Sequence, residues 1–192
     1  MSTADDDRTI ATLPDGLWSQ PTPSGVDLPH GDEAVQRVRI PARIEYLYTP
    51  GLASTRFLRA LEQKRIVGER CPVTHDVYVP PRGMSPVVGL PPTEQVEVGP
   101  KGTITTFCVV HIGFGVNAPP TPFVSALVLP DGAAISLYGT VLEIPIEEIH
   151  IGMRVEPVWA PDEELTTSFE NIRYWRPIDE PDVPAEQLKG HM

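Results

Sequence analysis

Hydrophobic and polar residues alternate with the period of β-strands over most of the second half of this 192-residue chain. The alternation predicts five to six strands, at residues 95–98, 103–112, 123–129, 134–143, 153–160 and 168–175. Turn sequences rich in glycine and proline, such as 99–102 and 130–132, separate neighbouring strands. One short helical turn is expected at 146–150. Several short strands with little helix make this a mainly β chain and favour a small barrel or sandwich.

The segment before these strands has a different pattern. Residues 37–48 alternate by twos and are expected to be extended. Thr49 and Pro50 then indicate an N-cap followed by proline at the first helical position. An apolar stripe predicts one helix that ends near Gly68. The stripe consists of Leu52, Phe57, Leu58, Leu61 and Ile66.

Residues 70–89 have the layout of a zinc ribbon, with two short knuckles, a hairpin arm and a Pro-Pro-Arg turn. A ribbon of this kind needs cysteine pairs spaced C-x-x-C, but the four positions hold Cys71, Thr74, Ser85 and Val88. Structural zinc takes four nitrogen, sulfur or carboxylate ligands in a tetrahedron. His75 adds a second ligand type beside Cys71, but the far knuckle supplies no pair. The sequence therefore predicts a degenerate ribbon without zinc, in which Cys71 is a relic.

The charge of the chain is unevenly distributed. Residues 1–35 carry a net −6 and residues 179–192 a net −3, and both are expected to be solvated acidic ends, the first of them disordered. Residues 83–178 carry −7, which argues against a single-stranded nucleic-acid barrel, since such barrels need a basic groove. No signal peptide or membrane-spanning stretch is expected, and two cysteines do not make a disulfide framework. These features predict a soluble cytoplasmic protein.

Residues 36–82 form the one basic segment, with a net +5. Arginine suits phosphates because its planar fork gives bidentate hydrogen bonds, so this segment is a candidate site for a compact anion such as a nucleotide phosphate. The equally weighted alternative is ordinary surface ion pairs to Glu62 or Glu69. The candidate side chains are Arg56, Arg59, Lys64, Arg65, Arg70 and Arg82.

Two further features lie on and after the strand predicted at 103–112. Strict alternation puts Ile104 and Cys108 on one face and His111 on the other, so Cys108 is expected to be a small buried hydrophobe rather than a nucleophile paired with His111. The following loop, 111–123, is apolar and rich in proline. It is expected to be covered, either by folding over its own barrel or by entering the active-site entrance of a partner.

Ordered motifs over about two-thirds of the chain resemble one known family. They are Tyr48-x-x-Gly51, Phe57-Leu58-x-x-Leu61, Gly68-x-Arg70-Cys71-Pro72, Tyr78-x-Pro80-Pro81-Arg82, Gly102-x-Ile104-x-x-Phe107-x-Val109-Val110-His111, Pro122-Phe123-Val124-x-Ala126-Leu127-Val128, Ile151-Gly152-Met153-Arg154-Val155 and Arg173-Tyr174-x-Arg176-Pro177. In this order they resemble the acyl-CoA-associated OB-fold family, also called domain of unknown function 35.

The resemblance implies a helical N-terminal segment, a rubredoxin-like zinc ribbon, here degenerate, and a five-stranded OB-fold barrel. The expected organisation is then an arm at 1–35, an extended segment plus helix at 36–68, the ribbon-like module at 69–92, the barrel at 93–178 and a tail at 179–192. The extension before residue 36 is not part of the family pattern.

The resemblance also implies a function. Such proteins accompany thiolases, lipid-transfer-type aldolases or acyl-CoA hydratases in lipid and steroid catabolism, so we expect a non-catalytic subunit that helps to hold an acyl-CoA, with no cofactor of its own. The alternatives are a free-standing acyl-CoA binding protein, an enzyme such as a thioesterase, and a single-strand nucleic-acid binder. The candidate acyl or partner contacts are Phe107, His111, Phe114, Pro120 and Phe123.

Overall fold

The computed structural model describes residues 48–112 and 120–191. The chain divides into two units, Met1–Leu47 and Tyr48–Met192, and the helices and strands below belong to the second. The predicted disordered arm at 1–35, most of the extended segment at 37–48 and the candidate residue Phe114 lie outside the described residues. Within the described part, no helix is long and apolar enough to cross a membrane.

Helix α1 spans Leu52–Leu61 and packs through one face. Its buried residues are Ala53, Phe57, Ala60 and Leu61, which repeat at the spacing of a helical stripe. The predicted start at Thr49 is wrong, because the N-cap is Gly51 and Leu52 lies 77% exposed in the first turn.

The predicted end of this helix near Gly68 is also wrong. The chain leaves the helix after Leu61, turns at Lys64 with a φ of 57°, and enters strand β1 at Ile66. Ile66 is buried as predicted, but in a sheet rather than in the helical stripe. Gly68 serves a different purpose, since a Cβ there would lie 2.6 Å from Val77 Cγ1 across the strand pair.

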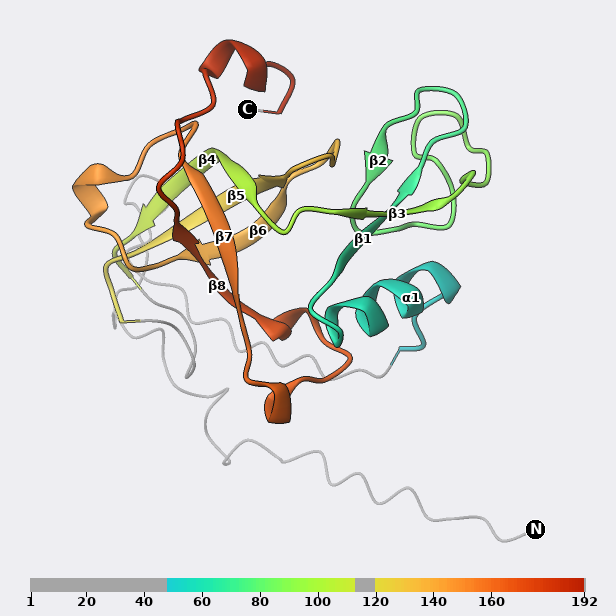
Figure 1. Ribbon diagram of the computed structural model, residues 1–192, viewed down its shortest axis with the longest axis horizontal. Coiled ribbons are helices and arrows are strands. Elements are labelled where there is room, and N and C mark those ends of the chain that lie inside the picture. Colours follow the sequence, from blue (N-terminus) through green and yellow to red (C-terminus); the bar gives the residue numbers. More distant parts are fainter. Residues whose placement is uncertain (1–47, 113–119, 192) are drawn as a thin grey trace, which may run out of the picture. The chain divides into compact units, whose positions relative to one another are not determined.

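A three-stranded antiparallel sheet follows, in the order β2-β1-β3, with α1 beside it (Figure 1). The strands are β1 (Ile66–Arg70), β2 (Val77–Tyr78) and β3 (Gln95–Val98). The long excursion between β2 and β3 contains the second ribbon knuckle, so the ribbon-like segment is built on this sheet.

Five strands then close into a barrel in the order β4-β5-β6-β8-β7. They are β4 (Gly102–Val110), β5 (Phe123–Pro130), β6 (Leu137–Val141), β7 (Arg154–Trp159) and β8 (Ile172–Pro177). All neighbours are antiparallel except β6 and β8, which are parallel. A closed five-stranded barrel with this order is the architecture of an OB fold, so the predicted fold class is confirmed.

Short 3-10 helices fill the connections. They are η1 (Ile146–Glu148), η2 (Asp162–Glu164), η3 (Phe169–Asn171) and η4 (Ala185–Leu188). The helical turn expected at 146–150 is confirmed by η1. The strand expected at 168–175 begins late, because η3 occupies its first residues.

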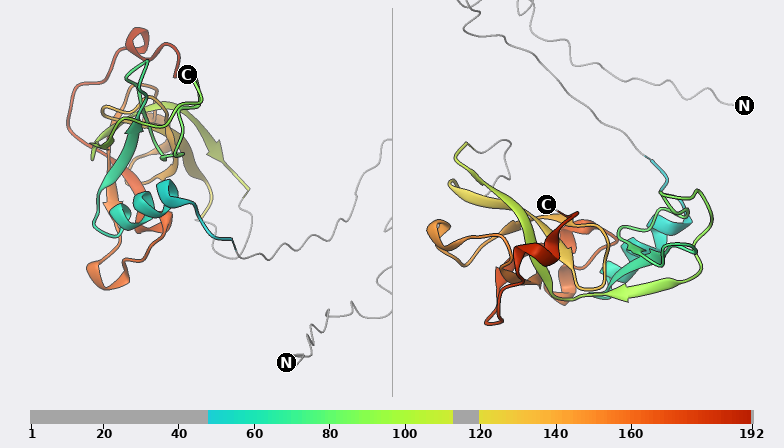
Figure 2. Two further views of the ribbon diagram at one scale, coloured as in Figure 1. Left: turned by 90° about the vertical axis from the view of Figure 1, so that its right-hand side faces the viewer. Right: turned by 90° about the horizontal axis from the view of Figure 1, so that it is seen from above.

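One hydrophobic core runs from α1 and the small sheet into the barrel. Phe57 of α1 and Phe169 of η3 meet with ring centroids 6.1 Å apart, which ties the helix to the barrel side. Ion pairing adds to this, since Lys64 Nζ lies 2.6 Å from Asp162 Oδ1. The two further views in Figure 2 show the sheet and helix at one side of the barrel.

A β-bulge in β4 overturns the prediction for Cys108. The register with β5 shifts between Ile104 and Thr106, and Thr105 turns its hydroxyl to Leu127 O at 3.2 Å. Because one residue is inserted, the alternation reverses after the bulge. Cys108 therefore faces outward and is exposed, whereas strict alternation had placed it in the core with Ile104.

The C-terminal segment, residues 178–191, lies against the barrel. Val183 N–H donates to Gly152 O at 2.9 Å, and η4 buries Leu188 to 3% exposure. Gly152 has a φ of 94°, and a Cβ there would lie 2.4 Å from Val183 O, so glycine permits this close approach. Figure 1 shows η4 beside one end of the barrel.

Most of this segment is exposed, as expected of a solvated acidic end, but two of its acidic side chains have partners on the barrel. Glu180 pairs with Lys101 and, at 3.2 Å, with Arg154 Nε. Lys101, and after it Arg154, hold the pKa of Glu180 below its ordinary value. Asp182 Oδ2 lies 2.8 Å from His150 Nε2. Composition alone predicted the charge but not these partners.

Candidate functional site

The ribbon-like segment brings together two of the four positions that carry zinc ligands in an intact ribbon. Cys71 directly follows β1, and its Sγ lies 3.1 Å from Ser85 Oγ on the second knuckle. Thr74 N–H points at the same sulfur at 3.4 Å. Ser85 N–H donates to Leu90 O at 2.8 Å, which closes the second loop around the serine. The knuckles thus keep their arrangement around a thiol–hydroxyl contact.

The donor set does not fit zinc. Val88 offers only carbon, Ser85 is engaged with Cys71, and a closed site requires four ligands of the nitrogen, thiolate or carboxylate type. Over residues 48–112 and 120–191, no three His, Cys, Asp or Glu side chains gather in a way that could hold a metal ion. The knuckles are therefore held by hydrogen bonds and packing among the described residues.

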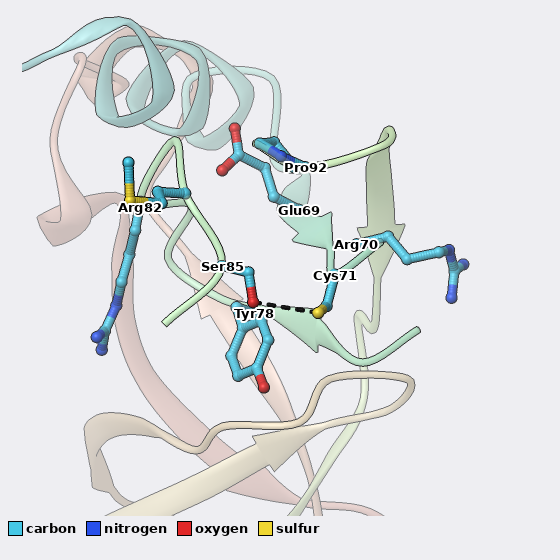
Figure 3. A pocket seen from close by; sticks show the side chains of 8 residues that line it. Glu69, Arg70, Cys71, Tyr78, Arg82, Ser85 and Pro92 are labelled. Carbon is cyan, nitrogen blue, oxygen red and sulfur yellow. Dashed lines mark hydrogen bonds between the residues drawn. The ribbon is translucent and has the colours of Figure 1, made fainter. Parts of the chain in front are cut away.

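Beside the Cys71–Ser85 contact is a small cavity of about 10 Å³ (Figure 3). Its lining residues are Glu69, Arg70, Cys71, Tyr78, Arg82, Met84, Ser85 and Pro92. A cavity of this size holds about one water molecule. It is therefore far too small for an acyl chain or a nucleotide.

The electrostatic character of Cys71 follows from its contacts. Burial raises the pKa of the thiol, but hydrogen bonds from the Ser85 and Thr74 side chains and from the backbone N–H groups of Thr74 and Val73 together lower the pKa to about 7. With 1% of its surface exposed, the sulfur is nonetheless closed off from large reagents. Its contacts suit a structural role inside the knuckle.

The six basic candidates divide into paired and unpaired side chains. Arg65 Nε lies 2.7 Å from Glu97 Oε2, and Arg70 Nε lies 2.6 Å from Glu94 Oε1. Lys64 is paired with Asp162 of η2, as described above. The expected partners Glu62 and Glu69 are not used by these bases. Sequence spacing could not reveal Glu94 and Glu97, because β3 meets β1 only in the folded sheet.

The other three candidates are Arg56, Arg59 and Arg82, which are exposed and have no ion-pair partner in the described part of the chain. Arg56 and Arg59 lie three residues apart on α1 and so share a face. The turn that carries Arg82 lies against the start of this helix, since an ideal Cβ on Gly83 would be 3.6 Å from Ala53 Cβ. Figure 3 shows Arg70 and Arg82 extending in different directions, so they do not form one cluster.

The candidate acyl or partner contacts around the 111–123 loop differ in how exposed they are. Phe107 is half-buried and packs against the barrel core. His111 and Pro120 are exposed, and Phe123 is half-buried where β5 begins. Phe123 pairs with Val110, which places it beside the exit of β4.

Comparisons with known proteins agree with this geometry. Residues 95–160 match the family model described as the C-terminal OB-fold domain of ChsH2. A DUF35 domain-containing scaffold protein from Methanocaldococcus jannaschii is 29% identical over 118 residues, which is 60% of this chain and 82% of the relative. The barrel is thus an OB-fold domain, and its sequence is similar to those of DUF35-family proteins, the family that the sequence motifs resemble.

One solved structure shares the fold. The structure named Ltp2-ChsH2(DUF35) aldolase aligns with a TM-score of 0.51 and 24% identity, covering 68% of this chain and 98% of that one. A DUF35-family protein of unknown function from Sulfolobus solfataricus aligns with a TM-score of 0.49 and 16% identity, covering 66% and 84%.

Proposed function

We propose that this chain is a non-catalytic subunit that associates with a thiolase-superfamily enzyme, either a thiolase or a lipid-transfer-type aldolase, or with an acyl-CoA hydratase. In this role it helps to hold an acyl-CoA in lipid or steroid catabolism in the cytoplasm. The observation that carries the proposal is the match to a relative named as a DUF35 scaffold protein, over most of that relative's length. The aldolase whose name includes a DUF35 component supports the class of partner.

The geometry of the described residues supports a shared rather than a private substrate site. The cavity beside Cys71 has room for about one water molecule, and the Cys71 thiol is committed to Ser85. We place the acyl-CoA on the surface of this chain, where a partner supplies the opposite wall and the reacting groups.

Arg56, Arg59 and Arg82 are the side chains best placed to hold the phosphates of a CoA. They are exposed and unpaired within the described residues, while Lys64, Arg65 and Arg70 already neutralise carboxylates. A phosphate bound by Arg65 or Arg70 would first have to displace Glu97 or Glu94. Phosphates form bidentate, charge-assisted hydrogen bonds with unpaired guanidinium groups.

The experiment is purification of the untagged chain from its native cell at low salt, followed by mass spectrometry of the co-purifying proteins. We expect a stoichiometric thiolase-superfamily or hydratase subunit. The purified complex should also bind CoA esters more tightly than the chain alone, as measured by calorimetry.

Two outcomes would count against the proposal. A chain that purifies alone and binds acyl-CoA tightly would be a free-standing binder. A chain that purifies alone and turns over acyl-CoA esters would be an enzyme in its own right.

A further inference from the structure

One part of the barrel surface carries no charge, although 21% of the residues in the chain are charged. Residues paired across antiparallel strands share a face of the sheet, so the register of β4, β5 and β6 identifies which side chains point outward. The Thr106–Leu127–Tyr138 and Cys108–Ser125–Thr140 rows face away from the core, as does the Val110–Phe123 pair. We call these eight residues the uncharged face.

The rest of the barrel has a different outer surface. The residues of β7 and β8 that point away from the core include Glu156 and Arg176 at the surface and Arg154, which is buried, and these charges are already paired. Arg176 Nη2 lies 2.7 Å from Glu156 Oε1, and Arg154 Nη2 lies 2.6 Å from Asp131 Oδ2. The outward side chains of β7 and β8 therefore include charges that are paired within the chain. The outward side chains of the uncharged face on β4, β5 and β6 are apolar or carry hydroxyl or thiol groups.

Except for Ser125, which is buried at 8% exposure, the residues of the uncharged face are half-buried or exposed among the described residues. Tyr138 is 62% and Leu127 37% exposed, and these two lie opposite each other on β5 and β6. Cys108 is exposed in the neighbouring row. Closure of the barrel holds all three side chains on rigid strands, so the face is preformed.

We infer that the uncharged face is the surface on which the chain docks its enzyme partner. The inference rests on the proposed function and adds the location and chemistry of the contact. The partner that fits is a protein subunit whose own docking surface is apolar and hydroxyl-bearing, because any charge buried against this face would lack a counter-charge. Charged residues are depleted at the centre of protein interfaces, as they are here.

Charge also distinguishes this partner from other occupants. A second copy of the chain would bring together two molecules with a net charge of −11, and the face offers no base to offset their repulsion. Nucleic acids and anionic membranes need basic side chains, and the face has none. An uncharged protein surface meets neither obstacle.

Another apolar group of residues, Val73, Met84, Val87 and Leu90 on the ribbon-like segment, is the competing surface. It is interspersed with exposed charged or titratable residues, namely His75, Asp76 and Arg82. It therefore provides a matched control, because Val87 is 63% exposed, almost the same as Tyr138.

Cys108 is a built-in reporter of docking. The chain has two cysteines, of which Cys71 is buried and Cys108 is exposed at the uncharged face. The experiment measures the rate of N-ethylmaleimide addition to Cys108 by peptide mass spectrometry, in the isolated chain and in the purified complex with its thiolase-class or hydratase subunit. We expect at least about a 10-fold slower reaction in the complex.

The second arm compares two variants of equal exposure. Tyr138→Glu should weaken the complex by about 10-fold or more, since it places an unpaired carboxylate in the interface, while Val87→Glu should leave the affinity within about 2-fold. Circular dichroism and thermal melting confirm that both variants are folded.

The outcomes separate the inference from the proposed function. An intact complex in which Cys108 reacts at the free rate, or in which both variants bind equally well, overturns the inference and leaves the proposed function standing. Protection of Cys108 in the isolated chain overturns it as well, pointing to a second copy if the protection depends on concentration and to another part of the same chain if it does not. Absence of any such enzyme subunit overturns both.

Discussion

At the scale of single residues, the tightest fit in the barrel is between Gly139 and Trp175. A Cβ on Gly139 would lie 2.5 Å from both Cδ1 and Nε1 of the Trp175 ring, which is fully buried. Gly139→Ala should therefore destabilise the protein by about 1–3 kcal/mol through overpacking. For a chain of this size that lowers the melting temperature by roughly 2–4 °C per kcal/mol, measurable by calorimetry.

A double-mutant cycle tests the cause of this loss. Trp175→Phe makes the ring smaller and removes Nε1, one of the two atoms nearest Gly139, whose N–H has no partner in the described residues. The double variant Gly139→Ala/Trp175→Phe should lose less stability than the sum of the losses in the two single variants. Strictly additive effects would mean that the glycine is required for another reason.

The residue scale is also where sequence reasoning was weakest. Cys108 was assigned to the core because strict alternation cannot anticipate the bulge at Thr105, whose hydroxyl is held by contacts with β5 and Ser136. The partners of Arg65 and Arg70 were missed because β3 is distant in sequence. The contact between Cys71 and Ser85 was foreseeable, since their spacing is that of ribbon ligands.

At the scale of elements, the ribbon-like segment keeps the geometry of a metal site without its ligands. Thr74→Cys, Ser85→Cys and Val88→Cys together should restore a four-cysteine set, because Cys71 and Ser85 already lie in contact and Thr74 N–H already points at the sulfur. We expect the triple variant to bind one zinc ion per chain, measured by atomic emission after dialysis.

A second test of zinc binding is the effect of a chelator on the melting temperature. EDTA should lower the melting temperature of the zinc-loaded triple variant, because metal binding contributes to folding, and should leave the natural chain unchanged. A folded triple variant that takes up no zinc would show that the knuckles have diverged too far to hold a tetrahedral site.

The C-terminal segment makes a pH-dependent contact with the barrel. His150 Nδ1 lies 2.7 Å from Glu148 O and Nε2 lies 2.8 Å from Asp182 Oδ2, so both ring nitrogens donate only when the imidazole is protonated. The Glu148 carbonyl, and then Asp182, raise the pKa of His150 above its ordinary value of 6.5. This contribution to stability is fully present below pH 6.5 and is lost as pH rises through the folded pKa.

Asp182→Asn should lower the pKa of His150 in an NMR titration of the ring protons. The variant should also lose less stability than the natural chain between about pH 6 and pH 8, where His is the side chain that ordinarily titrates. An unchanged His150 pKa in this variant would show that the Glu148 carbonyl alone holds the proton.

At the scale of the whole molecule, the sequence predicted the order of strands and turns better than it predicted the contacts and chemistry of the surface. The strands and their turns were recognisable from alternation and glycine–proline signals, because closing a barrel needs only that each strand has one apolar face. The ordered C-terminal segment was not recognisable, because its attachment depends on Gly152, Arg154 and His150, which lie elsewhere in the chain. The uncharged face could be assigned only from the register of β4, β5 and β6.

The distribution of charge over the whole molecule leads to the last prediction. The chain is acidic overall, but α1 presents Arg56 and Arg59 without counter-ions in the described part. In the purified enzyme complex, the double variant Arg56→Ser/Arg59→Ser should bind CoA about 10-fold or more weakly, since each charged hydrogen bond to a phosphate contributes about 1.5–3 kcal/mol. Calorimetry at two salt concentrations measures this, and added salt should reduce the difference by screening.

Arg65→Ser is the matched control, because Arg65 has the same charge on the same basic segment but already neutralises Glu97. Its removal should change CoA affinity by less than about 2-fold, within the range of long-range screening effects. Equal losses in the control and in the double variant would mean that CoA responds to net charge rather than to the exposed face of α1. No loss in either would place the phosphates on the partner subunit, so that this chain contributes position and shape rather than charge to the shared site.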